Sequence, residues 1–354
     1  MSEAQHLPDT LEHGGNLAEA TARFGEPPGG WVDLSTGINP TPFPLSAAPA
    51  ATWHRLPEAD GLEAQAAAHY AAGNGAALAL PGSQAAISLL PALHSPGNVA
   101  IPAPEYAEHA RAWQHWGHRV ERITAERIAA GPPTPPPWHT LVLSHPNNPS
   151  GTRYPAAILL AWCDALAAGG GHLIVDEAFC DAEPETSLAP AVGRPGLILL
   201  RSLGKFYGLA GARVGFLLGP EGLRQQLAGV LGPWPLAGPA RHAAGQALAD
   251  EAWQAAQRHA LTAATQRLDG LLTAAGLAPA GGTALFRWVP CTAARRYQAL
   301  LARAGVWVRA FDEPAGLRLG LPGTEAAWQR LAAALQTLTA DDGTRPYSPQ
   351  SSGR

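Results

Sequence analysis

The strongest constraint on the fold is a regular alternation of apolar runs and helical segments between residues 76 and 218. Runs of strand length fall at 76–80, 98–101, 140–144, 173–175, 197–200 and 214–218. Apolar strands separated by helical crossovers are typical of a mainly parallel sheet that is covered by helices on both faces. The sequence therefore predicts an α/β fold over this region.

A chain of 354 residues is longer than one hydrophobic core usually serves, so we expect a large and a smaller domain. The large domain, which holds the parallel sheet, is predicted at 50–245. A smaller α+β domain is predicted from 13–49 together with 246–340. Its expected elements are a long helix at 249–274 and short strands at 284–289, 306–310 and 317–319. Residues 341–354 are polar and contain proline, which predicts a disordered tail.

Charge and cysteine content exclude several classes of function. The formal net charge of −4 gives no general attraction to nucleic acid or to an anionic membrane. The N-terminal segment lacks the apolar stretch of a signal peptide, and no apolar run approaches membrane-spanning length. Cys163, Cys180 and Cys291 lie far apart without a Cys-x-x-Cys pair, so we expect neither a metal site nor a disulfide. We therefore expect a cytoplasmic protein.

The segment from 201 to 215, RSLGKFYGLAGARVG, holds the most informative polar residues. Lys205 follows the end of a predicted strand, with Ser202 three positions before it and Arg213 eight positions after it. A lysine amine can condense with an aldehyde, and serine and arginine can donate hydrogen bonds to a phosphate. The pattern therefore favours a phosphorylated aldehyde cofactor, and its alternative is a solvated turn that happens to contain basic residues.

The spacing S-x-x-K-x-x-G-L-A-G-x-R-x-G resembles the lysine segment of fold-type I pyridoxal-phosphate enzymes. Within this family it is most similar to the branch that contains histidinol-phosphate aminotransferases and threonine-phosphate decarboxylases. The resemblance extends from about residue 13 to about residue 340. It implies the fold of that family, pyridoxal 5'-phosphate as the cofactor, a small phosphorylated amino acid as the substrate, and a homodimer.

A second predicted anion site follows the strand at 76–80. The sequence Pro-Gly-Ser-Gln places a glycine and a hydroxyl at a helix start, where free amides and the helix dipole face a ligand. In the family this segment holds the cofactor phosphate, so the resemblance implies Gly82, Ser83 and Gln84 as contacts. An ordinary helix cap is the alternative.

The resemblance assigns further cofactor contacts to residues that follow other predicted strands. Tyr106 matches the aromatic residue that stacks on the pyridine ring, although a tyrosine packed at a helix start is the alternative. Asn148, in the sequence His-Pro-Asn-Asn-Pro-Ser-Gly, matches the asparagine that donates to the phenolate oxygen of the cofactor. Asp176 ends the strand at 173–175, where open α/β sheets place ligand groups.

Asp176 and Lys205 form the predicted catalytic pair. A carboxylate opposite the pyridine nitrogen raises the pKa of that nitrogen and keeps it protonated, so the ring can accept electrons from the substrate α carbon. Lys205 binds the cofactor and later moves a proton at that carbon. Loss of a carboxylate or of a hydrogen from the same carbon would give decarboxylation or transamination, and the spacing does not distinguish these outcomes.

The predicted substrate contacts are mostly basic or glycine-rich. Arg318, in GLRLG, matches the C-terminal arginine with which the family binds a substrate anion. His13, in HGGN, and Gly37, in DLSTGINP, lie in two motifs that resemble the start of threonine-phosphate decarboxylases. Arg153 is a further predicted phosphate contact. A surface role is the alternative for each lone arginine or histidine.

Two departures from the family pattern bear on the reaction. Phe179 stands where aminotransferases usually have a tyrosine, and Leu56 stands where they carry a tyrosine that reaches the neighbouring subunit's cofactor. Together with the two N-terminal motifs, Phe179 favours decarboxylation of L-threonine O-3-phosphate to (R)-1-amino-2-propanol O-2-phosphate for cobalamin synthesis. The alternatives are a histidinol-phosphate aminotransferase and a non-catalytic binding protein of the same fold.

Overall fold

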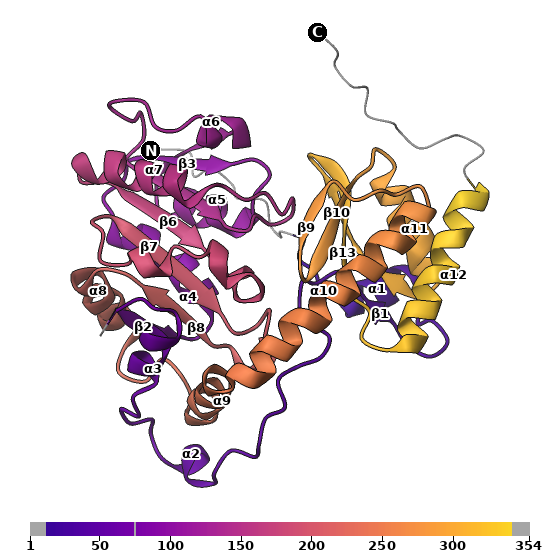
Figure 1. Cartoon of the computed structure of the whole chain (residues 1–354), viewed down its shortest axis with the longest axis horizontal. Coiled ribbons are helices and arrows are strands. Elements are labelled where there is room, and N and C mark those ends of the chain that lie inside the picture. Colours follow the sequence, from indigo (N-terminus) through magenta and orange to yellow (C-terminus); the bar gives the residue numbers. More distant parts are fainter. Residues whose placement is uncertain (1–11, 74–75, 342–354) are drawn as a thin grey trace. The chain divides into compact units, whose positions relative to one another are not determined.

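The computed structural model describes residues 12–73 and 76–341 and divides into two compact units (Figure 1). Of these residues, the first unit contains 41–148 and 152–258, and the second contains 12–40, 149–151 and 259–341. The boundary expected at residue 245 lies inside a helix, whereas the chain passes between the units within the following helix. The expected tail lies outside the described residues except for Asp341, which is helical.

The first unit is built on a seven-stranded sheet, which confirms the predicted α/β fold with a mainly parallel sheet. The strands, in spatial order, are β2 (Ala77–Leu80), β8 (Gly215–Leu218), β7 (Leu197–Ser202), β6 (His172–Asp176), β5 (Thr140–Ser144), β3 (Asn98–Pro102) and β4 (Arg119–Ile123). Among the described strands of this sheet, β8 alone runs antiparallel to its neighbours β2 and β7. The carboxyl ends of the other strands therefore meet at one edge of the sheet, and β8 begins at that edge.

Helices cover the sheet (Figure 1). Those of the first unit are α2 (Ala51–His54), α3 (Leu62–His69), α4 (Ser83–Leu89), α5 (Ala107–His115), α6 (Ala125–Ala129), α7 (Ala156–Ala168), α8 (Glu221–Leu231), α9 (Gly238–Ala249) and the start of α10 (Glu251–Ala274). One face of the central strands packs its apolar side chains against α4, α5 and α8. Every residue of the adjacent strands β5 and β7 is buried, as is every residue of β6 except His172, which agrees with their long apolar runs.

The predicted long helix begins slightly later than expected, at Glu251 rather than at 249. Asp250 separates it from α9 and accepts a hydrogen bond from the backbone nitrogen of Trp253 at 2.9 Å. An aspartate at this position satisfies a free amide of the first turn and so fixes the helix start.

The second unit contains a four-stranded antiparallel sheet in the order β12-β13-β10-β9 and a two-stranded pair, β1 and β11. Its elements are α1 (Leu17–Phe24), β1 (Val32–Asp33), β9 (Gly281–Thr283), β10 (Phe286–Pro290), α11 (Ala294–Arg303), β11 (Val306–Trp307), β12 (Arg309–Asp312), β13 (Ala315–Gly320), α12 (Glu325–Asp341) and the rest of α10. The single strand predicted at 306–310 is wrong. It divides at Val308, because β11 pairs with β1 and β12 pairs with β13.

The described residues contain neither a membrane-spanning helix nor a metal-binding cluster. No described helix combines the length and the apolar character that a bilayer crossing requires. In the same part of the chain, no group of three or more histidine, cysteine or acidic side chains is arranged to hold a metal ion.

Candidate active site

The residues predicted to contact the cofactor follow the strands of the first sheet at its carboxyl edge. Gly82 comes after β2, Ser202 ends β7, Asp176 ends β6 and Asn148 comes after β5. The pairing register places Ser144 opposite Asp176, Asp176 opposite Leu200, and Ser202 opposite Gly215. The fold therefore arranges these side chains in one row, at the edge where open α/β sheets bind ligands.

At one end of this row, the chain approaches itself closely around Gly82. A β carbon on Gly82 would lie 2.7 Å from the guanidinium of Arg213, and one on Gly215 would lie 2.4 Å from the amide nitrogen of Ser83. Arg213 itself has φ +52°, a left-handed conformation that costs a non-glycine residue about 1 to 2 kcal/mol. The Ser83 amide and the Arg213 guanidinium thus approach these glycines so closely that no larger side chain fits there, as a phosphate cradle requires.

The aromatic residue predicted to stack on the cofactor borders the same space. The hydroxyl of Tyr106 donates to Oε1 of Gln84 at 3.1 Å, and this bond joins the start of α5 to the start of α4. Tyr106 also lies edge-on to His109, with ring centroids 5.9 Å apart. The structure therefore brings Tyr106 and Gln84 together with the residues around Gly82.

Asp176 is buried and joined to a residue that the sequence did not reveal. Its Oδ1 accepts from the backbone nitrogen of Ala178 at 3.0 Å, and its Oδ2 lies 3.3 Å from Nε2 of His109. Burial alone would lower the pKa of His109, but the hydrogen bond and charge of Asp176 and the charge of Glu105 raise it. The carboxylate of Asp176 therefore has two nitrogen partners, the Ala178 amide and the His109 ring. The sequence does hold one signal for His109: it lies three residues after Tyr106, on the first turn of α5, and therefore on the same side of the helix.

Lys205 lies beyond the end of β7, and its Nζ is 5.5 Å from the ring centroid of Phe179. Phe179 is buried and follows Asp176 by three residues, so the amine and the carboxylate belong to neighbouring segments. Lys205 is also the only lysine in the 354 residues, and all the other residues in the combined count of 24 lysines and arginines are arginines. The single lysine is a second sequence signal for a catalytic role of this segment, because arginine provides the positive charge everywhere else in the chain.

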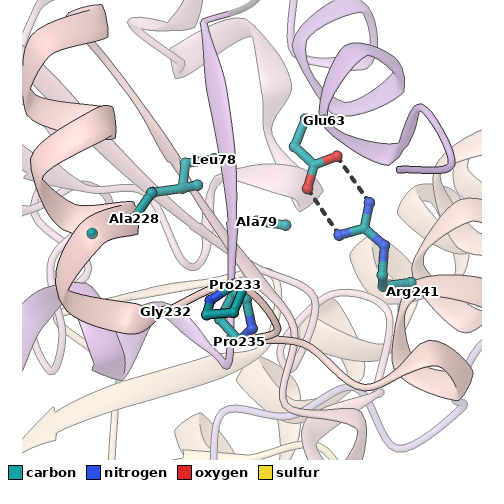
Figure 2. A pocket seen from close by; sticks show the side chains of 9 residues that line it. Glu63, Leu78, Ala79, Ala228, Gly232, Pro233, Pro235 and Arg241 are labelled. Atoms are coloured by element: carbon teal, nitrogen blue, oxygen red, sulfur yellow. Dashed lines mark hydrogen bonds and ion pairs between the residues drawn. The ribbon is translucent and has the colours of Figure 1, made fainter. Parts of the chain in front are cut away.

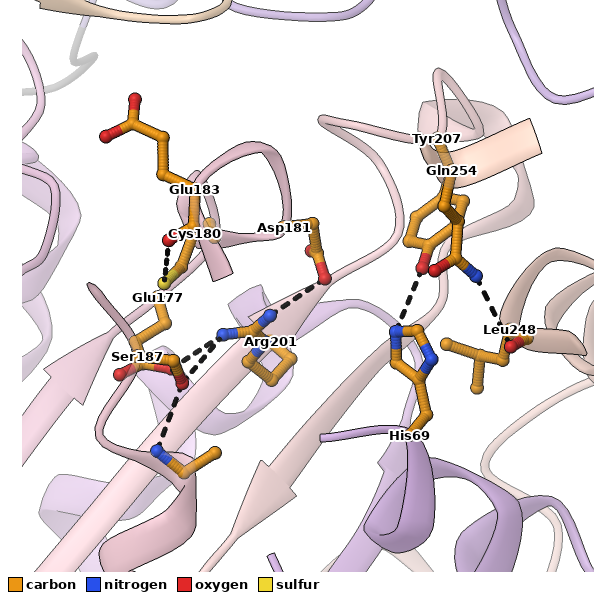
Figure 3. Close-up of polar contacts among 12 residues, drawn as sticks. His69, Glu177, Cys180, Asp181, Glu183, Ser187, Arg201, Tyr207, Leu248 and Gln254 are labelled. Carbon is orange, nitrogen blue, oxygen red and sulfur yellow. Dashed lines mark hydrogen bonds and ion pairs between the residues drawn. The ribbon is translucent and has the colours of Figure 1, made fainter. Parts of the chain in front are cut away.

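A buried ionic network joins Arg201 of β7 to two acidic side chains (Figure 3). Arg201 donates from Nη1 to Glu177 at 2.6 Å and from Nη2 to Asp181 at 2.8 Å, and all three side chains are almost fully buried. Because side chains alternate along a strand, Arg201 faces away from its neighbour Ser202, and Glu177 follows directly after Asp176. The network therefore joins the ends of β6 and β7 on the face of the sheet opposite to Ser202.

The buried thiols are unsuited to nucleophilic chemistry. Burial raises the pKa of Cys163 to about 11 and that of Cys180 to about 12. Both side chains therefore stay protonated at neutral pH and serve as packing groups.

Within the second unit, the N-terminal motifs and Arg318 come together. Gly15 donates from its backbone nitrogen to Oγ of Ser35 at 2.7 Å, and a β carbon on Gly14 would lie 2.3 Å from the Ser35 carbonyl oxygen. Arg318 is buried and donates from Nη2 to the same carbonyl oxygen at 2.6 Å. His13 and Gly37 flank these contacts in the sequence, and of the two, His13 is exposed and Gly37 is buried.

Arg153 has a carboxylate partner within the first unit. Its Nε and Nη2 donate to the two oxygens of Glu183, each at 2.6 Å, which is a bidentate ion pair. A phosphate that bound Arg153 would compete with this pair.

A separate cavity of about 460 Å³ lies beside the edge strand β2 (Figure 2). It is lined by Leu78 and Ala79 of β2, by Ala228 and Gly229 of α8, by Gly232, Pro233 and Pro235 after that helix, and by the pair Glu63 and Arg241. Arg241 donates to both Glu63 and Asp60, which neutralise its charge. No residue predicted to bind cofactor or substrate lines this cavity, so we do not assign it to the site.

His145 leads to a prediction about pH. Its Nε2 accepts from the backbone nitrogen of Tyr154 at 3.0 Å, and burial lowers the pKa of the ring to about 4. In the unfolded chain this histidine becomes protonated below about pH 6.5, whereas in the folded protein it stays neutral until about pH 4. The free energy of unfolding therefore decreases as the pH falls from 6.5 to 4, by about 3 kcal/mol at most. We expect His145→Gln, which keeps an acceptor for Tyr154, to lose less stability over this range in urea titrations of the cofactor-free protein.

The exposed residue His259 on α10 provides the matched substitution. Comparing His259→Gln with His145→Gln separates the loss of a buried imidazole from the loss of a histidine in general. Equal pH dependence in the wild type and in His145→Gln would contradict the assigned role of burial.

Comparison with known proteins identifies the family. The family model for aminotransferase class I and II matches residues 30–335. A threonine-phosphate decarboxylase from Pseudomonas aeruginosa is 51% identical over 329 residues, which cover 92% of this chain and 97% of that protein. A second threonine-phosphate decarboxylase, from a Sinorhizobium species, is 41% identical over 340 residues and covers 93% of this chain and 98% of its own length.

A solved structure shows the same fold at much lower sequence identity. The histidinol-phosphate aminotransferase from Sinorhizobium meliloti, crystallised with pyridoxal 5'-phosphate, superposes with a TM-score of 0.76 at 19% identity. The match covers 96% of this chain and 98% of that one. From the family match and the two relatives, the chain belongs to the class I and II aminotransferase family, in the group of threonine-phosphate decarboxylases.

Proposed function

We propose that the chain decarboxylates L-threonine O-3-phosphate to (R)-1-amino-2-propanol O-2-phosphate, the linker used in cobalamin synthesis, with pyridoxal 5'-phosphate as cofactor. The observation that carries the proposal is the similarity to two threonine-phosphate decarboxylases over more than nine-tenths of the chain. The row of polar groups at the carboxyl edge of the sheet, with a single lysine, supports the same chemistry.

The residues at this edge fit the cofactor. The space between Gly82, Ser83 and Arg213 offers amide, hydroxyl and guanidinium donors to a phosphate. Asp176 is a buried carboxylate supported by His109, and it suits a protonated ring nitrogen. Tyr106 would stack on the ring and Asn148 would donate to its phenolate oxygen, while Ser202 would add a donor to the phosphate.

Each protein group has a separate task in the reaction. When bound, the cofactor supplies an electron sink for the electron pair that remains when the substrate α carbon loses its carboxylate. Asp176 keeps the ring nitrogen protonated, and the Ala178 amide and His109 hold its carboxylate in place. Lys205 then delivers a proton to the α carbon, so that hydrogen replaces the departing carbon dioxide.

We propose that Arg318, Gly37 and His13 bind the substrate anions. Arg318 is a buried guanidinium that uses Nη2 for the Ser35 carbonyl, and its planar fork suits a carboxylate or a phosphate. Arg153 would add a phosphate contact by exchanging Glu183 for the ligand.

Product analysis tests the proposal. Purified protein with pyridoxal 5'-phosphate and L-threonine O-3-phosphate should release carbon dioxide without any keto acid. Turnover of histidinol phosphate that depends on a keto acid would instead support the aminotransferase. The absence of a visible absorbance band after cofactor addition would support the non-catalytic binding protein.

We further propose a homodimer and a cytoplasmic location. The exposed large apolar side chains Leu45, Trp53, Leu56, Val230 and Trp234, which we call the apolar patch, have exposed fractions of 44 to 70%, and we propose that they lie at the dimer interface. The segment that holds Trp53 approaches the start of α9, because a β carbon on Gly238 would lie 2.5 Å from the carbonyl oxygen of Thr52. Large apolar side chains exposed to solvent are typical of protein interfaces. The free cysteines fit a reducing compartment.

The dimer gives a direct prediction. We expect the wild type to sediment at twice the chain mass of 36.7 kDa, and Trp53→Arg to weaken the dimer by about thirtyfold or more, because a buried tryptophan at an interface often contributes about 2 kcal/mol. Trp116→Arg is the matched control, since Trp116 is 42% exposed at the end of α5, outside the patch. Equal association of both variants would refute this interface.

A further inference from the structure

Glu105 is a buried carboxylate with three nitrogen donors directed at it. It lies between β3 and α5 and is 7% exposed. Its Oε1 accepts from the backbone nitrogen of Tyr106 at 2.8 Å. Its Oε2 accepts from the backbone nitrogen of Ser144 at 2.8 Å and from Nδ2 of Asn147 at 3.1 Å. Every contact requires an acceptor, so the ionised carboxylate fits this environment.

The three donors come from two segments at the carboxyl edge of the sheet, the start of α5 and the end of β5 with the turn that follows it. Tyr106 carries the ring proposed to stack on the cofactor. Ser144 is the last residue of β5, opposite Asp176 in the sheet. Asn147 precedes Asn148, and its Nδ2 also donates to the carbonyl oxygen of Pro104 at 3.1 Å. One carboxylate therefore fixes the spacing between the aromatic residue and the asparagine that are both expected to touch the cofactor.

We propose that Glu105 is a positioning residue, which sets the places of Tyr106 and Asn148 against the cofactor without touching the cofactor itself. The inference rests on the proposed use of pyridoxal 5'-phosphate. It adds to the reaction a residue that the lysine, aspartate and glycine motifs do not include.

The charges around Glu105 are consistent with this role. Burial raises the pKa of Glu105, while the charge of His109 and the bonds from Ser144 favour its ionised form. Burial lowers the pKa of His109, but the bond and charge of Asp176 and the charge of Glu105 raise it more. Glu105 and Asp176 thus both favour the protonated form of His109.

Glu105→Gln tests the proposal with a nearly unchanged side-chain shape. A glutamine has one oxygen, so its amide nitrogen must face at least one of the three N–H donors, and that segment is displaced. We expect the dissociation constant for pyridoxal 5'-phosphate to rise about tenfold or more, and the visible circular dichroism of the bound cofactor to decrease.

Two comparisons distinguish positioning from general destabilisation. Leu227→Ala removes a fully buried side chain of α8, which carries no predicted site residue, and provides a variant that loses stability in urea. It should leave cofactor affinity and the visible circular dichroism unchanged at a temperature where it is folded. In the Asn148→Ala background, Glu105→Gln should weaken cofactor binding less than it does in the wild type, because it acts partly through Asn148.

The outcomes are separable. Wild-type cofactor affinity and circular dichroism in Glu105→Gln would overturn the positioning role and leave the proposed function intact. Equal effects of Glu105→Gln with and without Asn148 would overturn the path through Asn148. Weakened cofactor binding in Glu105→Gln, in a protein that does not release carbon dioxide from threonine phosphate, would support the positioning role and overturn the proposed substrate.

Discussion

Lys205→Ala should release no measurable carbon dioxide from L-threonine O-3-phosphate, a loss of more than about 10⁴-fold. The side chain has two proposed tasks, to hold the cofactor through its amine and to deliver a proton to the α carbon, and alanine performs neither. The fold should survive, because Lys205 lies in the loop after β7 and contributes little to the core. Far-ultraviolet circular dichroism and urea midpoints, measured without cofactor, check this expectation.

Lys205→Arg is the matched control for charge. It keeps a cation near the Phe179 ring, 5.5 Å from the lysine nitrogen in the wild type, but an arginine remains protonated and cannot serve as the nucleophile. We expect it to be as inactive as the alanine variant. Substantial turnover in Lys205→Arg would mean that the charge, rather than the amine, is what the reaction requires.

The composition of the chain makes a chemical test unusually specific. Because Lys205 is the only lysine, borohydride reduction of the cofactor-loaded wild type should attach the cofactor to one lysine-containing peptide. The same treatment should attach it to no lysine in either variant. Turnover by Lys205→Ala at a rate close to the wild type would remove Lys205 from the mechanism, whatever the labelling shows.

The sequence predicted those parts of the fold that depend on local patterns. The strand at 140–144 has the predicted bounds and the helix at 249–274 ends where predicted, because an apolar run and a continuous helical pattern are local signals. The strand at 306–310 was not, because its division at Val308 follows from two different partner strands. No pattern within the segment itself records which distant strand it will pair with.

The same distinction applies to the site. Lys205, Asp176 and Asn148 lie in motifs that a family resemblance can identify. His109 and Glu105 do not, because each acts through a partner that is distant in the sequence. His109 bonds to Asp176 across 67 positions, and Glu105 bonds to Ser144 across 39. Only the arrangement of β3, β5 and β6 side by side brings these groups together.

Asp176→Asn should keep the shape of the site and remove its most important negative charge. The asparagine oxygen can still accept from the Ala178 amide, as Oδ1 of Asp176 does at 3.0 Å, so the backbone should not move. Without the charge, the pKa of the cofactor's ring nitrogen falls, and the nitrogen loses its proton more readily. We expect turnover to fall on the order of 10² to 10³-fold and cofactor binding to weaken.

Asp181→Asn provides the matched control, because it removes another buried carboxylate of the same unit. Asp181 accepts from Arg201 at 2.8 Å, in the buried ionic network of Figure 3. Its loss should lower the urea midpoint, because the buried cation Arg201 loses one of its two carboxylate partners. At a temperature where the variant is folded, its turnover should stay within about tenfold of the wild type. If the two variants lost turnover equally, the effect would belong to the charge of the interior in general. Unchanged kinetics in Asp176→Asn would mean that the ring nitrogen is held by some other group, and the proposed pairing of Asp176 with Lys205 would fail.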